Sequence, residues 1–131
     1  MALNAYITAD GKEMGHAQAV QAWAANIEPR VEMNPILLKP QGDMTSQVIL
    51  MGTAVGRVQA ADYYRDYFDR GWAAITSCLD KLAAEFDYIV CEGAGSPAEI
   101  NLKHRDLTNM RVASYLQANT VLVADIDRGG V

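Results

Sequence analysis

Apolar residues along this chain occur either in short runs or at helical spacing, and the two patterns alternate. Short runs bounded by proline, glycine or carboxylates predict strands at 34–40, 47–52, 87–91 and 120–124, with a weaker piece at 55–60. Helical spacing predicts helices at 13–25, at 61–85, and from Asp106 or Thr108 to about 119. Residues 1–11 have no sustained period and are predicted to be a loop ending in the Asp10-Gly11 turn signal. Strands that alternate with helices predict an α/β fold with a doubly wound, mostly parallel sheet.

The longest helical segment carries one apolar stripe, which is more typical of a helix packed into a core than of a ligand site. Its members recur every three or four residues: Tyr64, Tyr67, Phe68, Trp72, Ile75, Leu79 and Leu82. The two cysteines, Cys78 and Cys91, fall in apolar segments outside any CxxC pair, so we expect buried free thiols.

The length and net charge of the chain exclude several classes of protein. At 131 residues we expect a single domain. The net charge of -5 argues against a nucleic-acid surface, because phosphate backbones require a basic face. No apolar run is long enough to cross a membrane and the amino terminus lacks a signal-peptide pattern, so we expect no membrane partner and a cytoplasmic protein.

Carboxylates follow two of the predicted strands, and glycines follow the carboxylates. Glu92 precedes Gly93 after the strand at 87–91, while Asp125, Asp127 and Arg128 follow the strand at 120–124. Ligands of open α/β sheets collect at the carboxyl ends of strands, which makes these positions candidate sites. From the residues alone, Glu92 could be a metal ligand, a water-binding group, or a helix cap or loop anchor.

Several longer motifs make the pattern specific. They occur in the order MALN at 1–4, DGKEMG at 10–15 followed by AQ at 17–18, MNPILLKP at 33–40, EGAGSPAEINL at 92–102 and VADIDRGGV at 123–131. Together they closely resemble the cobyric acid synthase family of cobalamin biosynthesis, and the resemblance extends over essentially the whole chain. The resemblance implies a P-loop NTPase-like, dethiobiotin synthetase-like fold related to cobyrinic acid a,c-diamide synthase.

The resemblance also implies an activity. Enzymes of this family use Mg-ATP to activate carboxylates of adenosylcobyrinic acid a,c-diamide, which ammonia then attacks. The ammonia comes from glutamine, hydrolysed in a separate carboxyl-terminal glutaminase domain. ATP and Mg²⁺ are therefore the expected cofactors, and a corrinoid and glutamine or ammonia are the expected partners of the intact enzyme.

Carried over residue by residue, the family motifs make Glu92 a Mg²⁺ ligand and a catalytic residue. Asp106 acquires a role near the acyl phosphate or the corrin carboxylate, although capping of the following helix explains it equally well. Asp125, Asp127 and Arg128 could face nucleotide or substrate, and Arg128 could instead be held by one of the aspartates.

Asn4, Asp10 and Gln18 lie in matching segments and are assigned ligand contacts. Lys39 ends a predicted strand and could contact a phosphate or carboxylate, or be a solvated lysine. Two histidines depart from the family pattern: His16 stands where arginine is usual, and His104 where aspartate is common. We expect a neutral substitution at His104.

Two parts of the family are not found in the sequence: the phosphate loop GxxxxGK[ST] and the glutaminase domain. We therefore expect an incomplete synthetase domain, truncated at both ends and lacking the P-loop strand and helix. Loss of a central strand would expose sheet edge and favour self-association. A ParA-like or MinD-like nucleotide switch, and a non-catalytic binding or structural fragment, are the alternative functions.

We predict that the 131-residue chain alone has no appreciable synthetase activity, because the phosphate cradle lies outside it. The measurement is ATP-dependent amidation of a corrinoid carboxylate, with glutamine or ammonia as nitrogen donor, against a version extended upstream through the P-loop. Turnover by the chain at a rate comparable to that of the extended form would contradict the prediction.

Overall fold

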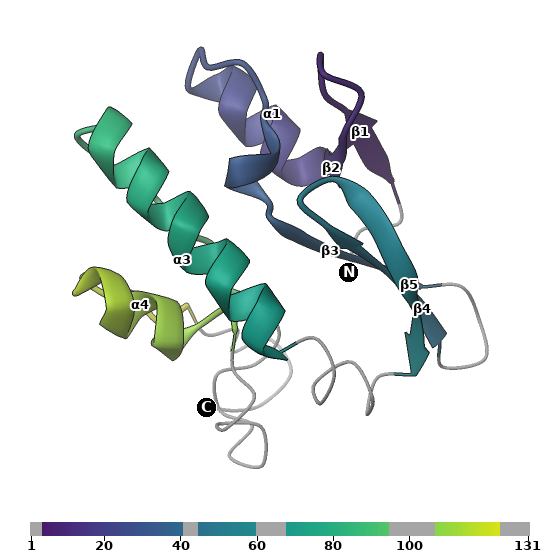
Figure 1. The fold of residues 1–131 in the computed structure, drawn as a ribbon. Coiled ribbons are helices and arrows are strands. Elements are labelled where there is room, and N and C mark those ends of the chain that lie inside the picture. Colours follow the sequence, from purple (N-terminus) through teal and green to yellow (C-terminus); the bar gives the residue numbers. More distant parts are fainter. Residues whose placement is uncertain (1–3, 41–44, 60–67, 95–106, 124–131) are drawn as a thin grey trace, which may run out of the picture. The chain divides into compact units, whose positions relative to one another are not determined.

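The computed structural model describes residues 4–40, 45–59, 68–94 and 107–123 (Figure 1). Its contacts divide the chain into two compact units, Met1–Cys91 and Glu92–Val131. The elements in chain order are β1 (Ala5–Ile7), β2 (Glu13–Gly15), α1 (His16–Ala24), the 3-10 turn η1 (Val31–Met33), β3 (Ile36–Pro40), β4 (Thr45–Leu50), β5 (Thr53–Gln59), α3 (Phe68–Glu85) and α4 (Met110–Leu116). Within the described part of the chain, no helix combines the length and apolarity needed to cross a bilayer.

Residues 4–24 form a hairpin and a helix rather than a loop and a longer helix. Strands β1 and β2 pair antiparallel, and α1 follows β2 without a break (Figure 1). The predicted helix start at Glu13 is therefore wrong, because Glu13 to Gly15 are extended and the hairpin uses their backbone groups. The buried face of α1 carries the small side chains of Ala19 and Ala22. Trp23 packs edge-on against Tyr6, with 5.2 Å between the ring centroids.

Strands β3, β4 and β5 form a second sheet in sequence order, and both pairings are antiparallel. The strands at 34–40 and 47–52 are confirmed in place, but they pair antiparallel with each other and not in the expected parallel way. Strand β4 in turn forms a hairpin with β5, and Met51 and Gly52 in the connection between them both have positive φ, 49° and 76°. Two such residues form the tight turn that reverses a chain between antiparallel strands.

Strand β4 contributes two of the most buried side chains in the described structure. Val48 and Ile49 are each 1% exposed, although neighbours in a regular strand point to opposite faces. The register with β5 shifts between these two residues, which marks a β-bulge.

Helix α3 confirms the long helix expected at 61–85 over its described residues. Its buried positions, Ile75, Cys78, Leu79 and Leu82, follow helical spacing. Burial raises the pKa of the Cys78 thiol, in keeping with an unreactive core cysteine. Tyr64 and Tyr67 of the predicted stripe lie outside the described residues.

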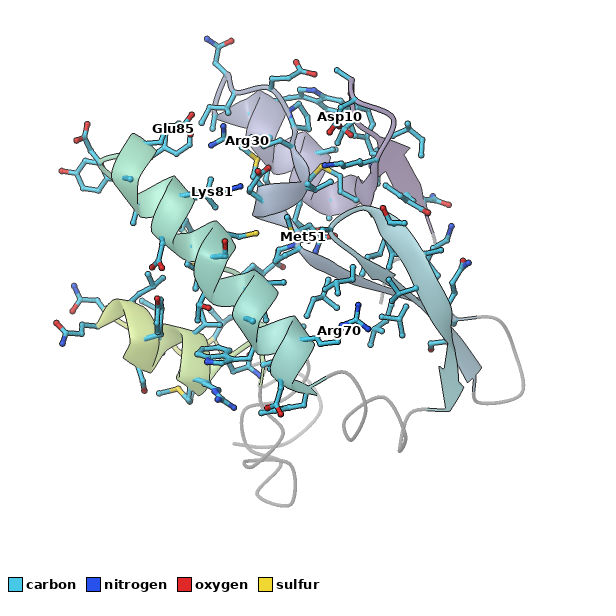
Figure 2. The ribbon with its side chains drawn as sticks, viewed as in Figure 1. Asp10, Arg30, Met51, Arg70, Lys81 and Glu85 are labelled. Carbon is cyan, nitrogen blue, oxygen red and sulfur yellow. The ribbon has the colours of Figure 1, made fainter. Side chains whose placement is uncertain are left out.

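Charged residues tie the segment around η1 to the carboxyl-terminal half of α3. Arg30 forms an ion pair with Glu85 and its guanidinium lies 5.5 Å from the centre of the Phe86 ring. Figure 2 shows Arg30 and Glu85 reaching toward each other, with Lys81 one turn earlier on the helix. Lys81 pairs with Glu32 at 3.4 Å, so two cross-element ion pairs hold this junction.

The two segments expected to be strands at 87–91 and 120–124 are not strands in the described structure. Val90 is 97% exposed, and Val121 to Val123 are also largely exposed. Cys91 is exposed as well, so the expectation of a buried thiol there is wrong. An apolar run becomes a strand only when its backbone finds a pairing partner, and none is present within the described ranges. The doubly wound parallel sheet therefore remains a prediction.

Asn34 connects the two sheets of the first unit. Its Oδ1 accepts a hydrogen bond from the backbone N–H of Gly15 at 2.7 Å, at the junction of β2 and α1. Its Nδ2 donates to the backbone oxygen of Ile36 at 3.2 Å, at the start of β3. One side-chain amide therefore fixes the end of one sheet against the beginning of the other.

We predict that Asn34→Ala lowers the free energy of unfolding by about 1–3 kcal/mol, because the buried N–H of Gly15 loses its acceptor. Denaturant unfolding of the chain measures the change. Ser77→Ala, on the exposed face of α3, serves as the control and should stay within about 0.5 kcal/mol of the unaltered chain. Equal losses in the two variants would contradict the role assigned to Asn34.

Candidate functional site

The predicted site residues divide between the described and the remaining parts of the chain. The described ones are Asn4, Asp10, Gln18 and Lys39 in the first unit and Glu92 in the second. Asp106, Asp125, Asp127, Arg128 and His104 lie outside the described residues. The described candidate residues therefore form two separate groups of side chains, one in each unit.

Asp10 lies in the turn between β1 and β2 (Figure 2). The hydroxyl of Thr8 donates to Asp10 Oδ1 at 2.5 Å, and Lys12 Nζ lies 3.3 Å from Oδ2. The Thr8 hydrogen bond, followed by the interactions with Lys12, lowers the pKa of Asp10 below its usual range. The Thr8 hydroxyl also accepts from Lys12 N–H at 3.0 Å, so Asp10 belongs to a closed turn that keeps its carboxylate ionised.

Gln18 and Asn4 lie near the start of α1. The Oε1 atom of Gln18 lies so close to Gly15 that a Cβ on that glycine would meet it at 2.3 Å. Gln18 thus folds back over the β2–α1 junction, which is a typical position for glutamine in the first turn of a helix. The backbone oxygen of Asn4 accepts from His16 N–H at 3.4 Å. The structure therefore brings Asn4 and Gln18 to the same junction.

Lys39 lies on β3 and pairs with Glu13 on β2. Its Nζ is 2.5 Å from Glu13 Oε1, and both side chains are partly buried, with 32% and 21% of their surface exposed. Glu13 was not among the residues that the sequence indicated. The two residues are 26 positions apart and lie in different sheets, so no local spacing could have revealed the pair.

Glu92 opens the second unit and is exposed. The loop that carries it is anchored two residues later, where the Ala94 oxygen accepts from Asn109 Nδ2 at 2.9 Å and Thr108 Oγ1 at 3.2 Å. Gly93 lies against the same asparagine, since a Cβ there would meet Asn109 Oδ1 at 2.2 Å. A side chain at position 93 would therefore displace the Asn109 amide from its present position.

Asn109 anchors the loop that carries Glu92, and the sequence reasoning did not single it out. It is the N-cap of α4, so the interpretation of Asp106 as that cap is wrong. Its side chain makes no capping hydrogen bond and instead holds the Glu92 loop. An asparagine before a helix is the signal that could have found the residue, but that signal predicts a cap and not a loop anchor.

The described residues do not form a metal centre by themselves. No group of three or more His, Cys, Asp or Glu side chains gathers within the described ranges. Mg²⁺ commonly uses one or two carboxylates and completes its shell with water and substrate phosphates. A single exposed carboxylate at Glu92 fits that mode of binding, whereas it does not fit a closed structural site.

Comparison with known proteins identifies strong relatives. The chain is 82% identical to cobyric acid synthase of Acaryochloris marina, 75% to that of Synechocystis sp. and 76% to that of Thermosynechococcus vestitus. Each match covers all 131 residues of this chain and 26%, 26% and 27% of the relatives, so the chain spans about a quarter of their length. No family model matches, and no solved structure matches. The resemblance drawn from the sequence motifs is confirmed.

We predict that Thr8→Val raises the pKa of Asp10, because the valine cannot donate the hydrogen bond that favours the ionised carboxylate. In the unaltered chain the depressed pKa stabilises the fold above the unfolded value of about 3.9, and this contribution is lost as pH falls through the lower folded value. A pH titration of the Asp10 carboxyl carbon by NMR measures the shift. Thr53→Val, at the exposed start of β5, should leave it unchanged. An unaltered Asp10 pKa in Thr8→Val would contradict the assignment.

Proposed function

We propose that this chain, whose sequence is that of a segment of the cobyric acid synthase family, supplies part of an ATP-dependent amidation site. The single observation that carries the proposal is 72–82% identity to cobyric acid synthases over 99–100% of the chain. In the proposed reaction, ATP phosphorylates a carboxylate of adenosylcobyrinic acid a,c-diamide, and glutamine-derived ammonia displaces the phosphate. The enzyme is a glutamine-hydrolysing amidoligase of cobalamin biosynthesis, acting in the cytoplasm.

Glu92 is the proposed magnesium ligand of this site. Its support is the exposed carboxylate on a loop held by Asn109, together with its place in the EGAGSPAEINL motif. Mg²⁺ supplies charge stabilisation for phosphoryl transfer when it is bound. The chain itself contributes a fixed loop, since Asn109 and Thr108 both donate to Ala94. Asp106 is proposed to act beside Glu92 on the acyl phosphate or corrin carboxylate.

Cationic and polar groups are proposed to bind the anionic parts of the substrates. Lys39 presents a primary ammonium on β3, and a lysine with a free donor binds phosphate as a point charge. Asn4, Asp10 and Gln18 are proposed contacts around the β1–β2–α1 segment, whose turn and junction the hydrogen bonds of Thr8 and Asn34 hold in shape. Asp125, Asp127 and Arg128 remain proposed contacts to nucleotide or substrate.

The doubly wound sheet is also a proposal. Its support is the exposed apolar character of Val90 and of Val121 to Val123, which are suited to a buried parallel strand. These segments would become strands when they pair with further β-structure of the complete polypeptide.

We predict that Glu92→Gln in the complete enzyme lowers kcat for corrinoid amidation about 100-fold or more, because a metal at a phosphoryl-transfer site is worth several kcal/mol. The apparent requirement for Mg²⁺ should rise in the same assay. Asp87→Asn is the matched control, since Asp87 is an exposed carboxylate five residues earlier, and it should retain activity. Equal turnover by the Glu92 variant and the unaltered enzyme would reject the metal role, while inactivity of the unaltered enzyme would reject the proposed function.

A further inference from the structure

We propose that Glu13 is a positioning residue for Lys39, holding its ammonium so that the remaining donors meet an oxyanion of the substrates. This inference rests on the proposed function and adds to it a residue that none of the sequence motifs singled out for a role. The oxyanion is either a phosphate of the nucleotide or a carboxylate of the corrinoid, which present the same chemistry to a lysine.

The pair is held in place from both sides. Glu13 lies on β2 opposite Ile7, and its backbone N–H donates to the Gly52 oxygen at 3.1 Å in the β4–β5 turn. Lys39 lies on β3 opposite Gln47 of β4. The two backbones are thus fixed independently by hydrogen bonds, and the 2.5 Å contact between Nζ and Oε1 spans them. A long lysine side chain that would otherwise sample several rotamers is confined to one direction.

The donor count of lysine leaves room for a ligand. An ammonium group carries three N–H donors and no acceptor. Among the residues that the structure describes, Glu13 is the partner of Lys39 Nζ, and one carboxylate oxygen accounts for one donor. With 32% of its side chain exposed, Lys39 can present its other donors to an anion that approaches from solvent.

A second lysine–glutamate pair shows what a purely structural version looks like. Lys81 and Glu32 lie 3.4 Å apart, and Lys81 is 61% exposed, so its ammonium is largely hydrated. Glu32 has the same 21% exposure as Glu13. The pairs therefore match in the acid but differ in contact distance and in the burial of the base. A partly buried ion pair generally adds little to stability. Positioning of the Lys39 ammonium is therefore the better-supported role of the Glu13–Lys39 pair.

The test compares Glu13→Gln with Glu32→Gln in the complete enzyme that contains this segment. Glu13→Gln should raise one Michaelis constant about ten-fold with kcat nearly unchanged, because a disordered Lys39 weakens binding of an anion. Glu32→Gln should leave both constants unchanged. A rise confined to the KM for ATP assigns a nucleotide phosphate, and a rise confined to the KM for the corrinoid assigns a substrate carboxylate.

The charge-swapped double variant Glu13→Lys/Lys39→Glu separates positioning from structure. It restores an ion pair, so its melting temperature should return to near that of the unaltered enzyme while the KM stays raised. Recovery of KM together with melting temperature would show a structural pair and overturn the inference, as would unchanged constants in Glu13→Gln.

Failure of the proposed function would be seen separately, as absence of corrinoid amidation by the unaltered enzyme. In that case calorimetric titrations with Mg-ATP and with the corrinoid decide on Glu13. Weaker binding of one of the two by Glu13→Gln than by the unaltered enzyme supports the inference, and unchanged binding of both, or binding of neither, overturns it.

Discussion

The side-chain amide of Asn34 joins the two sheets of the amino-terminal unit, since its Oδ1 accepts from Gly15 N–H and its Nδ2 donates to the Ile36 oxygen. Because the two bonds use opposite ends of the amide, the group can neither flip nor rotate without losing both. Pro35 follows and disfavours the helical region for Asn34, whose backbone has φ -149° and ψ 69°. The β1–β2–α1 segment and the three-stranded sheet therefore meet at a fixed point, and Glu13 and Lys39 can face each other across it.

Apolar burial, and not charge, dominates the stability of this unit. Met14, Val48 and Ile49 are almost completely buried, and each such side chain contributes on the order of 1.5–3 kcal/mol. Exposed ion pairs such as Lys12 with Asp10 contribute little to stability, because water screens the attraction between the two charges. The ion pair of Glu13 on β2 with Lys39 on β3 consequently matters more for the position of its charges than for the stability of the fold.

The sequence predicted most of the described elements and some of the site. Helix α3 and strands β3 and β4 were found because their apolar patterns are long or sharply bounded by proline and glycine. Strand β1 was missed since three residues carry no period, and β2 was assigned to a helix because Met14 happens to stand in phase with the apolar stripe of α1.

Predicting the site was harder, because it depends on contacts between distant residues. Glu92 and Lys39 could be singled out from motifs, but Glu13 and Asn109 owe their roles to contacts across 26 and 15 positions. The hairpin of β4 and β5 depends on the two positive φ angles at Met51 and Gly52, and methionine gives no sign of that conformation. Local pattern identifies an element more readily than its partner.

The hydrogen bonds around Ala94 have a consequence for how events at Glu92 could be observed. Thr108 and Asn109 both donate to the Ala94 oxygen, and Asn109 also begins α4. A displacement of the Glu92 loop must therefore strain or release the first turn of that helix. The backbone N–H of Ala113 donates to the Asn109 oxygen at 3.1 Å in this turn. Backbone amides in the first turn of α4 therefore report on the position of the loop. The rate of amide hydrogen exchange at the start of α4 would therefore change when a ligand binds the Glu92 carboxylate, although Glu92 belongs to a different segment.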